Sequence, residues 1–400
     1  MIKVGFILGL AGPEWLGGIS YYRNLFSAIS DLPNRKIDPV LIGSSQAMAE
    51  VQSRFSNSPI LHLPLLDSGG VLRKGRQVMR AIFGRDLLLE RALASQNIAV
   101  LSHSFYLGRR ASVASIAWIP DFQELTFPEF FTQKMLAARR RNAVRACRFS
   151  STVLLSSEAA LADLKRIGTR GAQTAVLPFV ANVPAGSELL RIDELRKKYE
   201  LSAGYFHLPN QFWVHKNHIV VLRALATLRK SGWASPVVAT GNRSDPRQPE
   251  HFESLMATAR ELGVDDLFVP LGVVPYQDLM SLMRHAIAII NPSKFEGWST
   301  TVEEAKSMGK HVILSDIAVH REQAPNRGTF FPADDSVMLA KELSEAVSQW
   351  DLNREQRYIE QAAAQLKGRR DAFARQYEDI VLATIARQES VAEHRRSLEK

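Results

Sequence analysis

The most informative segment for the fold reads Asn291-Pro-Ser-Lys-Phe-Glu-Gly-Trp-Ser-Thr-Thr-Val-Glu-Glu-Ala-Lys-Ser-Met-Gly309. It follows a short, isoleucine-rich run, Ala286–Ile290, which is typical of a buried parallel strand. Thr300 or Thr301 can cap a helix, a glutamate three residues later can complete a capping box, and Gly309 can end the helix. The segment therefore predicts a strand, a tight loop and a helix N-terminus, an arrangement that favours phosphate binding.

Strand-like and helix-length segments alternate from one end of the chain to the other. This alternation favours parallel sheets built from βαβ units. After Asp334 the pattern indicates helix only, ending in a charged, frayed tail at Glu389–Lys400. The expected strands are Ile2–Leu8, Pro39–Gly43, Ile98–His103, Val113–Ile119, Thr152–Leu155, Thr174–Leu177, Tyr205–Leu208, Val237–Thr240, Leu267–Pro270, Ala286–Ile290 and His311–Ser315.

A chain of 400 residues is too long for one compact core, so two domains are expected. The segment Val183–Glu188, with its proline and glycine, predicts a linker between them. The expected parts are residues 1–182, a linker at 183–202, a second domain at 203–367, and a C-terminal helix and tail at 368–400. The predicted fold class is α/β, with two doubly wound, Rossmann-like domains facing a central cleft at the carboxyl ends of their strands.

The composition is that of a globular protein, with 46% hydrophobic and 23% charged residues. A single cysteine, Cys147, excludes an intramolecular disulfide and suits a reducing compartment. The apolar run at the N-terminus is short and lacks a cleavage site, so we expect a first strand there and no signal peptide. No apolar run approaches the roughly 18–20 residues of a spanning helix. The expected location is the cytoplasm or the inner face of a membrane.

The net charge of +9 is concentrated in two segments, residues 73–85 and 139–145. In the first, Val78, Ile82 and Phe83 recur at helical spacing beside the cations. This pattern is typical of an amphipathic helix that rests on anionic lipid. It is equally typical of a solvated helix whose apolar stripe packs on its own domain. Nucleic acid is a less favoured partner, because the basic segments carry no zinc-finger spacing and no aromatic RNA-binding motif.

Three stretches together resemble a known family. Glu296 and Glu304 form a Glu-x7-Glu pair within a segment similar to the signature of glycosyltransferase family 4, whose members have the GT-B fold. The stretches Tyr205-Phe-His-Leu-Pro-Asn-Gln-Phe-Trp-Val-His-Lys-Asn-His218 and Trp118-Ile-Pro-Asp-Phe-Gln-Glu-Leu-Thr-Phe-Pro-Glu-Phe-Phe131 resemble further parts of it. The resemblance covers nearly the whole chain. It implies a retaining, metal-independent transferase that moves a sugar from a nucleotide-diphosphate sugar to a carbohydrate or lipid-linked glycan, in bacterial polysaccharide or lipopolysaccharide synthesis.

The resemblance also implies roles for single residues. Lys216 matches the diphosphate-binding lysine that opens a helix, and Glu304 matches the residue that holds the ribose. Glu296 is expected beside the donor sugar, and His103, at a strand end, near the reacting centre. The remaining candidates are Gly297, Trp298, Ser299, Thr300, Thr301 and Val273 at the donor, Gly17 and Gly18 in a glycine loop before the first helix, and Asp121 at the acceptor.

One position departs from the family. Many members carry an arginine on the diphosphate where this chain has Asn210, which supplies a hydrogen bond but no charge. Either Lys216 and the backbone of residues 297–301 suffice, or another cation such as Arg243 takes the place of that arginine.

Other functions remain open on the sequence. A GT-B sugar-nucleotide epimerase would use the same residues without an acceptor, and a catalytically silent nucleotide-sugar-binding scaffold would keep only the binding. A two-carboxylate glycosidase is a further possibility, since spacing in sequence does not give the distance between carboxyl groups. His215 and His218 flank Lys216, but no third ligand lies near them and no Asp-x-Asp motif is present, so neither a metal nor another cofactor is expected.

Overall fold

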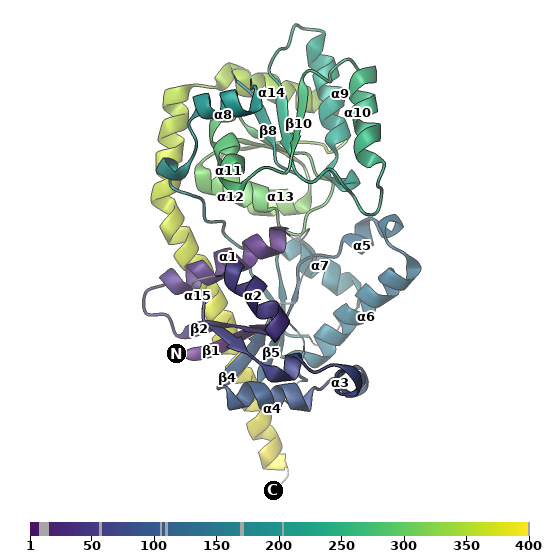
Figure 1. Cartoon of the computed structure of the whole chain (residues 1–400), viewed down its shortest axis with the longest axis vertical. Helices are drawn as coiled ribbons and strands as arrows, with labels where there is room; N and C mark the ends of the chain where they lie inside the picture. The colour runs from purple at the N-terminus through teal and green to yellow at the C-terminus, as the bar shows by residue number, and fades with distance from the viewer. Residues whose placement is uncertain are drawn as a thin grey trace. The chain divides into compact units, whose positions relative to one another are not determined.

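The computed structural model describes residues 1–7, 16–55, 58–104, 106–108, 111–168, 172–201 and 204–398. The chain forms two compact units (Figure 1). Unit 1 comprises Met1–Phe179 together with Gly368–Lys400, and unit 2 comprises Val180–Lys367. Within the described ranges, every helix is too short or too polar to span a bilayer.

Unit 1 contains a parallel sheet in the order β3-β2-β1-β4-β5-β6-β7. The order runs outward in both directions from the pair β1 and β4, which is the doubly wound arrangement predicted from the βαβ pattern. Its strands are β1 (Ile2–Ile7), β2 (Ile37–Gly43), β3 (Ile60–His62), β4 (Ile98–Ser102), β5 (Ala114–Ile119), β6 (Thr152–Leu155) and β7 (Thr174–Val176). Its helices are α1 (Leu16–Asp31), α2 (Ser45–Arg54), α3 (Gly70–Phe83), α4 (Leu87–Ser95), α5 (Gln123–Thr126), α6 (Gln133–Phe149) and α7 (Glu158–Arg166), with short 3₁₀ turns η1 (Pro64–Leu66) and η2 (Pro128–Phe130).

Unit 2 contains a second parallel sheet, in the order β10-β9-β8-β11-β12-β13. Its strands are β8 (Phe206–Leu208), β9 (Val237–Thr240), β10 (Phe268–Gly272), β11 (Ile289–Asn291), β12 (Val312–Ser315) and β13 (Gly328–Phe331). Its helices are α8 (Ile192–Tyr199), α9 (His218–Arg229), α10 (His251–Glu261), α11 (Tyr276–His285), α12 (Thr300–Met308), α13 (Ala318–Gln323) and α14 (Ser336–Gln349), with 3₁₀ turns η3 (Gly186–Glu188) and η4 (Val214–Lys216).

Both faces of the second sheet are covered. Ile290 belongs to a buried apolar cluster with Leu225 and Leu343 on the helices of one face. Its neighbour Ile289 belongs to a separate cluster with Met283 on the other face. Successive side chains of a strand point to opposite faces, so a strand buried on both sides reads as a continuous apolar run. This is why the isoleucine-rich run predicts the strand, although β11 begins at Ile289 and not at Ala286.

The segment predicted as a linker, residues 183–202, contains α8 and packs into unit 2. Leu195 of α8 is fully buried in a cluster with residues of α11. The backbone N–H of Leu190 donates to Ser281 Oγ at 2.9 Å, and Lys198 pairs with the buried Asp278 at 2.5 Å. Proline and glycine at Val183–Glu188 mark only the entry to this helix.

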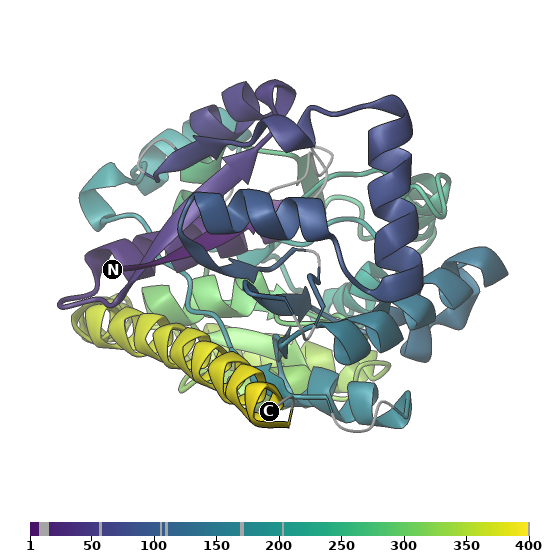
Figure 2. The same ribbon diagram turned by 90° about the horizontal axis from the view of Figure 1, so that it is seen from below.

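The C-terminal residues form one helix, α15 (Leu352–Leu398), which is 47 residues long. Its first part belongs to unit 2, where Glu355 pairs with the buried Lys310 at 2.9 Å. Its later part belongs to unit 1, where Tyr377 donates to Ser102 Oγ at 2.8 Å and the hydroxyls of Thr384 and Thr152 lie 2.8 Å apart. Figure 2 shows this later part as the yellow helix that ends at the C-terminus. The tail predicted to fray from Glu389 is helical as far as Leu398.

Candidate functional site

The candidate residues of unit 2 follow its two central strands. β8 and β11 are neighbours, and the chain winds away from them in opposite directions, towards β10 on one side and β13 on the other. At such a switch point the connections after the two strands diverge and leave a ligand-binding crevice at their carboxyl ends. Lys216 lies in the connection after β8, and Glu296 in the connection after β11.

Lys216 and Glu296 form a nearly buried ion pair. The ammonium Nζ donates to Glu296 Oε1 at 2.7 Å, and the side chains are 13% and 10% exposed, respectively. Lys216 ends the 3₁₀ turn η4, and α9 begins only at His218, because Asn217 between them adopts a left-handed conformation with φ of 59°. The prediction that Lys216 opens the helix is therefore wrong by two residues.

Two hydrogen bonds hold the connections after β8 and β11 together. The Asn217 side chain donates to Pro292 O at 3.0 Å, and the backbone N–H of Lys294 donates to His215 O at 2.8 Å. The backbone on each side of the ion pair is therefore fixed before any ligand arrives, which favours a preorganised site.

Glu296 is ionised at neutral pH. Burial alone raises the pKa of its carboxyl, but the ammonium of Lys216 and the ring of His320 outweigh burial and lower the pKa to about 2. Both roles expected of Glu296, orienting sugar hydroxyls and stabilising positive charge on the ring, require this ionised form.

Glu304 shows the opposite behaviour. It lies in the second turn of α12, is 6% exposed, and no donor among the described residues reaches its carboxylate. Burial raises the pKa of this carboxyl to about 8. No protein donor offsets this burial, so a ligand that brings hydroxyl donors would favour the ionised carboxylate.

Asn210 is part of a buried amide network at the switch point. Its Nδ2 donates to Asn291 Oδ1 at 2.9 Å, and Asn291 Nδ2 donates to Ser299 Oγ at 2.8 Å. Ser293 Oγ donates to the same Asn291 Oδ1 at 2.7 Å. In this structure Asn210 therefore ties β8 to the loop after β11, and a contact of its side chain with phosphate stays a prediction.

Ser299 caps α12. Its side chain accepts from the backbone N–H of Val302 at 3.4 Å, so the predicted cap at Thr300 or Thr301 is wrong. The hydroxyl of Thr301 instead donates to Pro209 O at 3.1 Å. Gly309 ends the helix in a left-handed conformation with φ of 70°, as predicted. Gly297 and Trp298 lie half-buried in the loop between Glu296 and the cap.

The two remaining donor candidates lie on the side of β9 and β10. Val273 directly follows β10 and is 67% exposed. Arg243 follows β9, where its guanidinium donates to Pro270 O at 2.7 Å and lies 5.0 Å from the centre of the Phe252 ring. Arg243 is thus held at the outer strands, whereas the ion pair follows the central ones. Whether it binds diphosphate stays a prediction.

His103 of unit 1 follows β4, at the switch point of the first sheet. Its ring lies among aromatic side chains, Nε2 is 2.7 Å from the Tyr21 hydroxyl, and Nδ1 is 2.7 Å from Ser102 Oγ. Burial lowers the pKa of the imidazole to about 3, so the ring is neutral. Both ring nitrogens have protein partners, and a direct role at the reacting centre would require one of these bonds to open.

Gly17 and Gly18 lie within the first turn of α1 and not in a loop before it. The connection between β1 and α1, residues 8–15, lies outside the described ranges. Asp121 accepts from the backbone N–H of Gln123 at 3.1 Å and pairs with Arg139 at 3.1 Å. These contacts stabilise the start of α5, and an acceptor contact of Asp121 stays a prediction.

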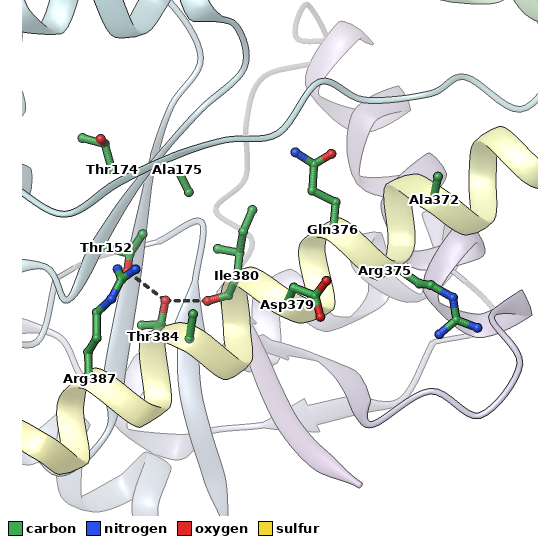
Figure 3. A pocket seen from close by; sticks show the side chains of 11 residues that line it. Thr152, Thr174, Ala175, Ala372, Arg375, Gln376, Asp379, Ile380, Thr384 and Arg387 are labelled. Atoms are coloured by element: carbon green, nitrogen blue, oxygen red, sulfur yellow. Dashed lines mark hydrogen bonds between the residues drawn. The ribbon is translucent and has the colours of Figure 1, made fainter.

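Metal ligands and cavities add little to this site. In the ranges that the structure describes, no group of three or more His, Cys, Asp or Glu side chains could hold an ion. His218 is fully buried and stacks on Phe212, with ring centres 4.6 Å apart. A cavity of about 440 Å³ lies in unit 1 between the later part of α15 and the strands β6 and β7 (Figure 3). Thr152, Gln376 and Arg387 line it, and none of the predicted site residues does.

Two residues next to the ion pair escaped the sequence analysis. His320 of α13 is fully buried, its Nδ1 lies 2.9 Å from Ser315 O, and its Nε2 has no hydrogen-bond partner among the described residues. A positive charge on this ring would favour the ionised form of Glu296, but burial lowers the pKa of the His320 imidazole. Asn291 is the centre of the amide network. A histidine five residues after a strand and an asparagine at a strand end carry no signal of their own in one sequence.

Comparisons with known proteins agree with this architecture. Solved structures similar to the whole chain include HepE from Anabaena in complex with UDP and glucose, at 16% identity with a TM-score of 0.63, covering 99% of this chain and 100% of that one. A glycosyltransferase from Rickettsia africae is 13% identical with a TM-score of 0.66, covering 96% and 98%. The lipopolysaccharide outer core galactosyltransferase WaaB is 14% identical with a TM-score of 0.60, covering 96% and 99%. No curated protein matches the chain by sequence.

One family model also matches, over residues 192–365, and its description is glycosyl transferases group 1. The matched residues contain the whole of the candidate site in unit 2, from Asn210 to Glu304. The chain therefore has the GT-B fold of these glycosyltransferases, and its second unit matches the group 1 glycosyl transferases.

Proposed function

We propose that this protein is a retaining glycosyltransferase, similar to family 4, that moves a sugar from a nucleotide-diphosphate sugar to a carbohydrate or lipid-linked glycan in bacterial surface polysaccharide or lipopolysaccharide synthesis. One observation carries the proposal. At the switch point of unit 2, an ion pair of Lys216 and Glu296 lies beside a helix whose buried Glu304 has no donor among the described residues. Such a site offers a cation to a diphosphate and a carboxylate to ribose hydroxyls.

The proposed chemistry assigns one task to each charged group. The bond between the anomeric carbon and the diphosphate oxygen breaks, and its electron pair stays on that oxygen. The acceptor hydroxyl oxygen bonds to the same face of the anomeric carbon, and its proton passes to the leaving diphosphate. Lys216 stabilises the negative charge that develops on the leaving group, and Glu296 stabilises the positive charge on the sugar ring.

Binding of the donor would exchange the partner of Lys216. In the free protein its ammonium is held by Glu296 at 2.7 Å. A diphosphate at the same crevice would take over this cation and release Oε1 of Glu296 for sugar hydroxyls. The amide network of Asn210 and Asn291 keeps the two loops in register during this exchange. Because Lys216 supplies a fixed positive charge, we propose that no divalent ion is needed.

The first experiment is thermal unfolding with UDP, GDP, dTDP or ADP in the presence of EDTA. HepE is described in complex with UDP and with UDP-glucose, so UDP is the first choice. At about a hundred times its Kd a nucleotide adds about 2.7 kcal/mol of stability. For a unit of this size the expected rise in Tm is ~5–10 °C.

The matched variants are Glu304→Gln, which should lose most of the shift, and Glu345→Gln on α14, an exposed glutamate of the same unit that should keep it. If none of the four nucleotides shifts the Tm, the proposal of a nucleotide-sugar site fails.

A silent scaffold is the second candidate, and Asn210 is the observation that favours it. An asparagine replaces the arginine expected at the diphosphate, and its side chain is engaged with Asn291. Incubation of UDP-glucose with a bacterial envelope extract separates the candidates. A transferase releases UDP only when the extract supplies an acceptor, and an epimerase produces an isomeric sugar nucleotide without it. The Tm of a scaffold rises with nucleotide, but a scaffold neither releases UDP nor forms an isomeric sugar nucleotide.

A further inference from the structure

Helix α3 shows an unusual orientation on unit 1. Most of its large apolar side chains point into solvent: Val71 is 88% exposed, Ile82 66% and Phe83 61%, and Leu72, Val78 and Met79 are also exposed. None of the α3 side chains that the structure describes is buried. The sequence left open whether this apolar stripe packs on its own domain or faces outward. The structure contradicts packing on its own domain. Scattered exposed apolar residues are ordinary, but a contiguous stripe along one helix marks an interaction surface.

One cation of α3, Arg76, holds the helix to the unit. The guanidinium of Arg76 donates to both carboxylate oxygens of the buried Asp86, at 2.9–3.2 Å, and to Leu65 O at 3.2 Å. At the end of the helix, Gly84 is left-handed with φ of 63°, and any larger side chain there would collide with the ring of Phe149. The outward direction of the apolar stripe is therefore fixed by ion pairing and close packing.

The surroundings of this stripe are strongly basic. Residues 70–83 contain Arg73, Lys74, Arg76 and Arg80 and no acidic residue. The neighbouring α6 contains six lysines and arginines and no acidic residue, and its last residue, Phe149, meets the end of α3. Both helices lie at the same flank of unit 1 in Figures 1 and 2. Met135 and Val144 of α6 are exposed as well.

We propose that α3 is an interfacial helix that docks unit 1 on a bilayer containing anionic lipid. The apolar stripe enters the boundary between headgroups and acyl chains, while Arg73 and Lys74 lie at headgroup level. Charge selects this occupant over a second copy of the chain, because pairing two such surfaces would bring together two copies each of the exposed Arg73 and Lys74, and α3 itself contains no acid. An anionic bilayer satisfies both the apolar stripe and the charge.

The test is sedimentation of the full chain with vesicles of phosphatidylcholine, with and without phosphatidylglycerol. We expect binding only when phosphatidylglycerol is present, and weaker binding as salt is raised. The variant I82S/F83S should lower the partition coefficient at least about tenfold. The matched control is V337S/L352S in unit 2, which removes two side chains that are equally exposed, 66% and 67%, and should bind like the wild type.

A second variant, R73Q/K74Q, should weaken binding to the anionic vesicles and reduce the salt dependence. All of the altered side chains are exposed, so the Tm of each variant should match that of the wild type. Sedimentation equilibrium without lipid completes the design. Three results would overturn the proposal: no binding of the wild type to the anionic vesicles, binding of I82S/F83S equal to wild type, or a wild-type dimer that I82S/F83S dissociates.

Discussion

At the scale of single residues, the two carboxyl groups of unit 2 lie in opposite electrostatic environments, and this predicts different roles. Glu296 is ionised beside Lys216, whereas Glu304 is protonated more easily because burial is not offset. We expect Glu296→Gln to lower kcat about 10²–10³-fold while nucleotide Kd changes little, because the charge is needed mainly in the transition state. Glu304→Gln should raise Kd and change kcat less. The rate of donor consumption measures kcat, and nucleotide titration measures Kd. Equal losses of kcat and of nucleotide affinity in the two variants would contradict these separate roles.

Glu304 also predicts a proton release. The folded-state pKa of about 8 lies above the usual glutamate value, so between about pH 4.5 and 8 the folded protein holds a proton that the unfolded chain has lost. Stability therefore falls as pH rises through this window, by at most about 1.4 kcal/mol per pH unit from this group, and levels off above pH 8. Glu304→Gln should flatten that part of the stability curve.

The raised pKa of Glu304 should also be visible in ligand binding. Ribose hydroxyls that donate to the carboxylate favour its ionised form, so nucleotide binding near pH 7 should release up to one proton. Calorimetry of UDP binding in buffers of different ionisation enthalpy counts this proton. In Glu304→Gln the release should vanish, and its persistence there would assign the proton to another group.

Site residues could be predicted where the sequence resembles a known motif. The match to the family signature singles out Lys216, Glu296 and Glu304, whose roles stay predictions. It could not identify His320 or Asn291, whose contributions depend on which side chains the fold brings beside them. The N-cap of α12 shows the same limit. Serine and threonine cap helices about equally well, so only the path of the loop determines that Ser299 is the cap.

At the scale of elements, the ends of α12 and α10 are followed by a matched pair of glycines. Gly309 and Gly263 are both left-handed, with φ of 70° and 64°. An added Cβ at Gly309 would collide with the backbone of Tyr358 in α15, whereas at Gly263 nothing lies within 4 Å. Gly263→Ala should therefore cost only the strain of the backbone, about 1 kcal/mol. Gly309→Ala should cost ~1–3 kcal/mol more, because α12 and α15 must move apart. Urea unfolding measures the free energy of unfolding of the two variants. Equal losses would show that α15 moves away from residue 309 without cost.

Strands could be predicted from the sequence where burial on both faces of a sheet requires a continuous run of apolar residues. The central strands follow this rule. The doubly wound order of each sheet was predictable for another reason, the alternation of strands and helices along the chain. The sequence missed β3 and β13, which are short edge strands with half-buried residues and so carry little alternation. It also took α8 for part of a linker, because five of its eight residues are charged and outnumber the apolar side chains, Ile192 and Leu195, that pack into the unit.

At the scale of the whole molecule, unit 1 is built from both ends of the chain. The later part of α15 contributes Phe373, Tyr377 and Val381, all buried, to a unit that otherwise ends at Phe179. No local pattern predicts this, since the sequence shows only a long polar helix. Burial of three large side chains stabilises by ~5–9 kcal/mol, which is comparable with the whole stability of a domain.

A chain that ends at Lys367 should therefore contain a folded unit 2 and an unfolded unit 1. We expect limited proteolysis to degrade residues 1–179 of this truncated chain while residues 180–367 resist, and UDP to raise the remaining Tm as in the full chain. A chain that ends at Glu389 keeps the buried residues and the hydrogen bond from Tyr377 to Ser102, so its unit 1 should stay resistant. Because Ser102 in turn contacts His103, loss of the later part of α15 would also remove the Tyr377 hydroxyl from the serine that holds the candidate histidine. Resistance of unit 1 in the shorter chain would mean that strands β1–β7 and their own helices suffice, and that α15 only lines a finished unit.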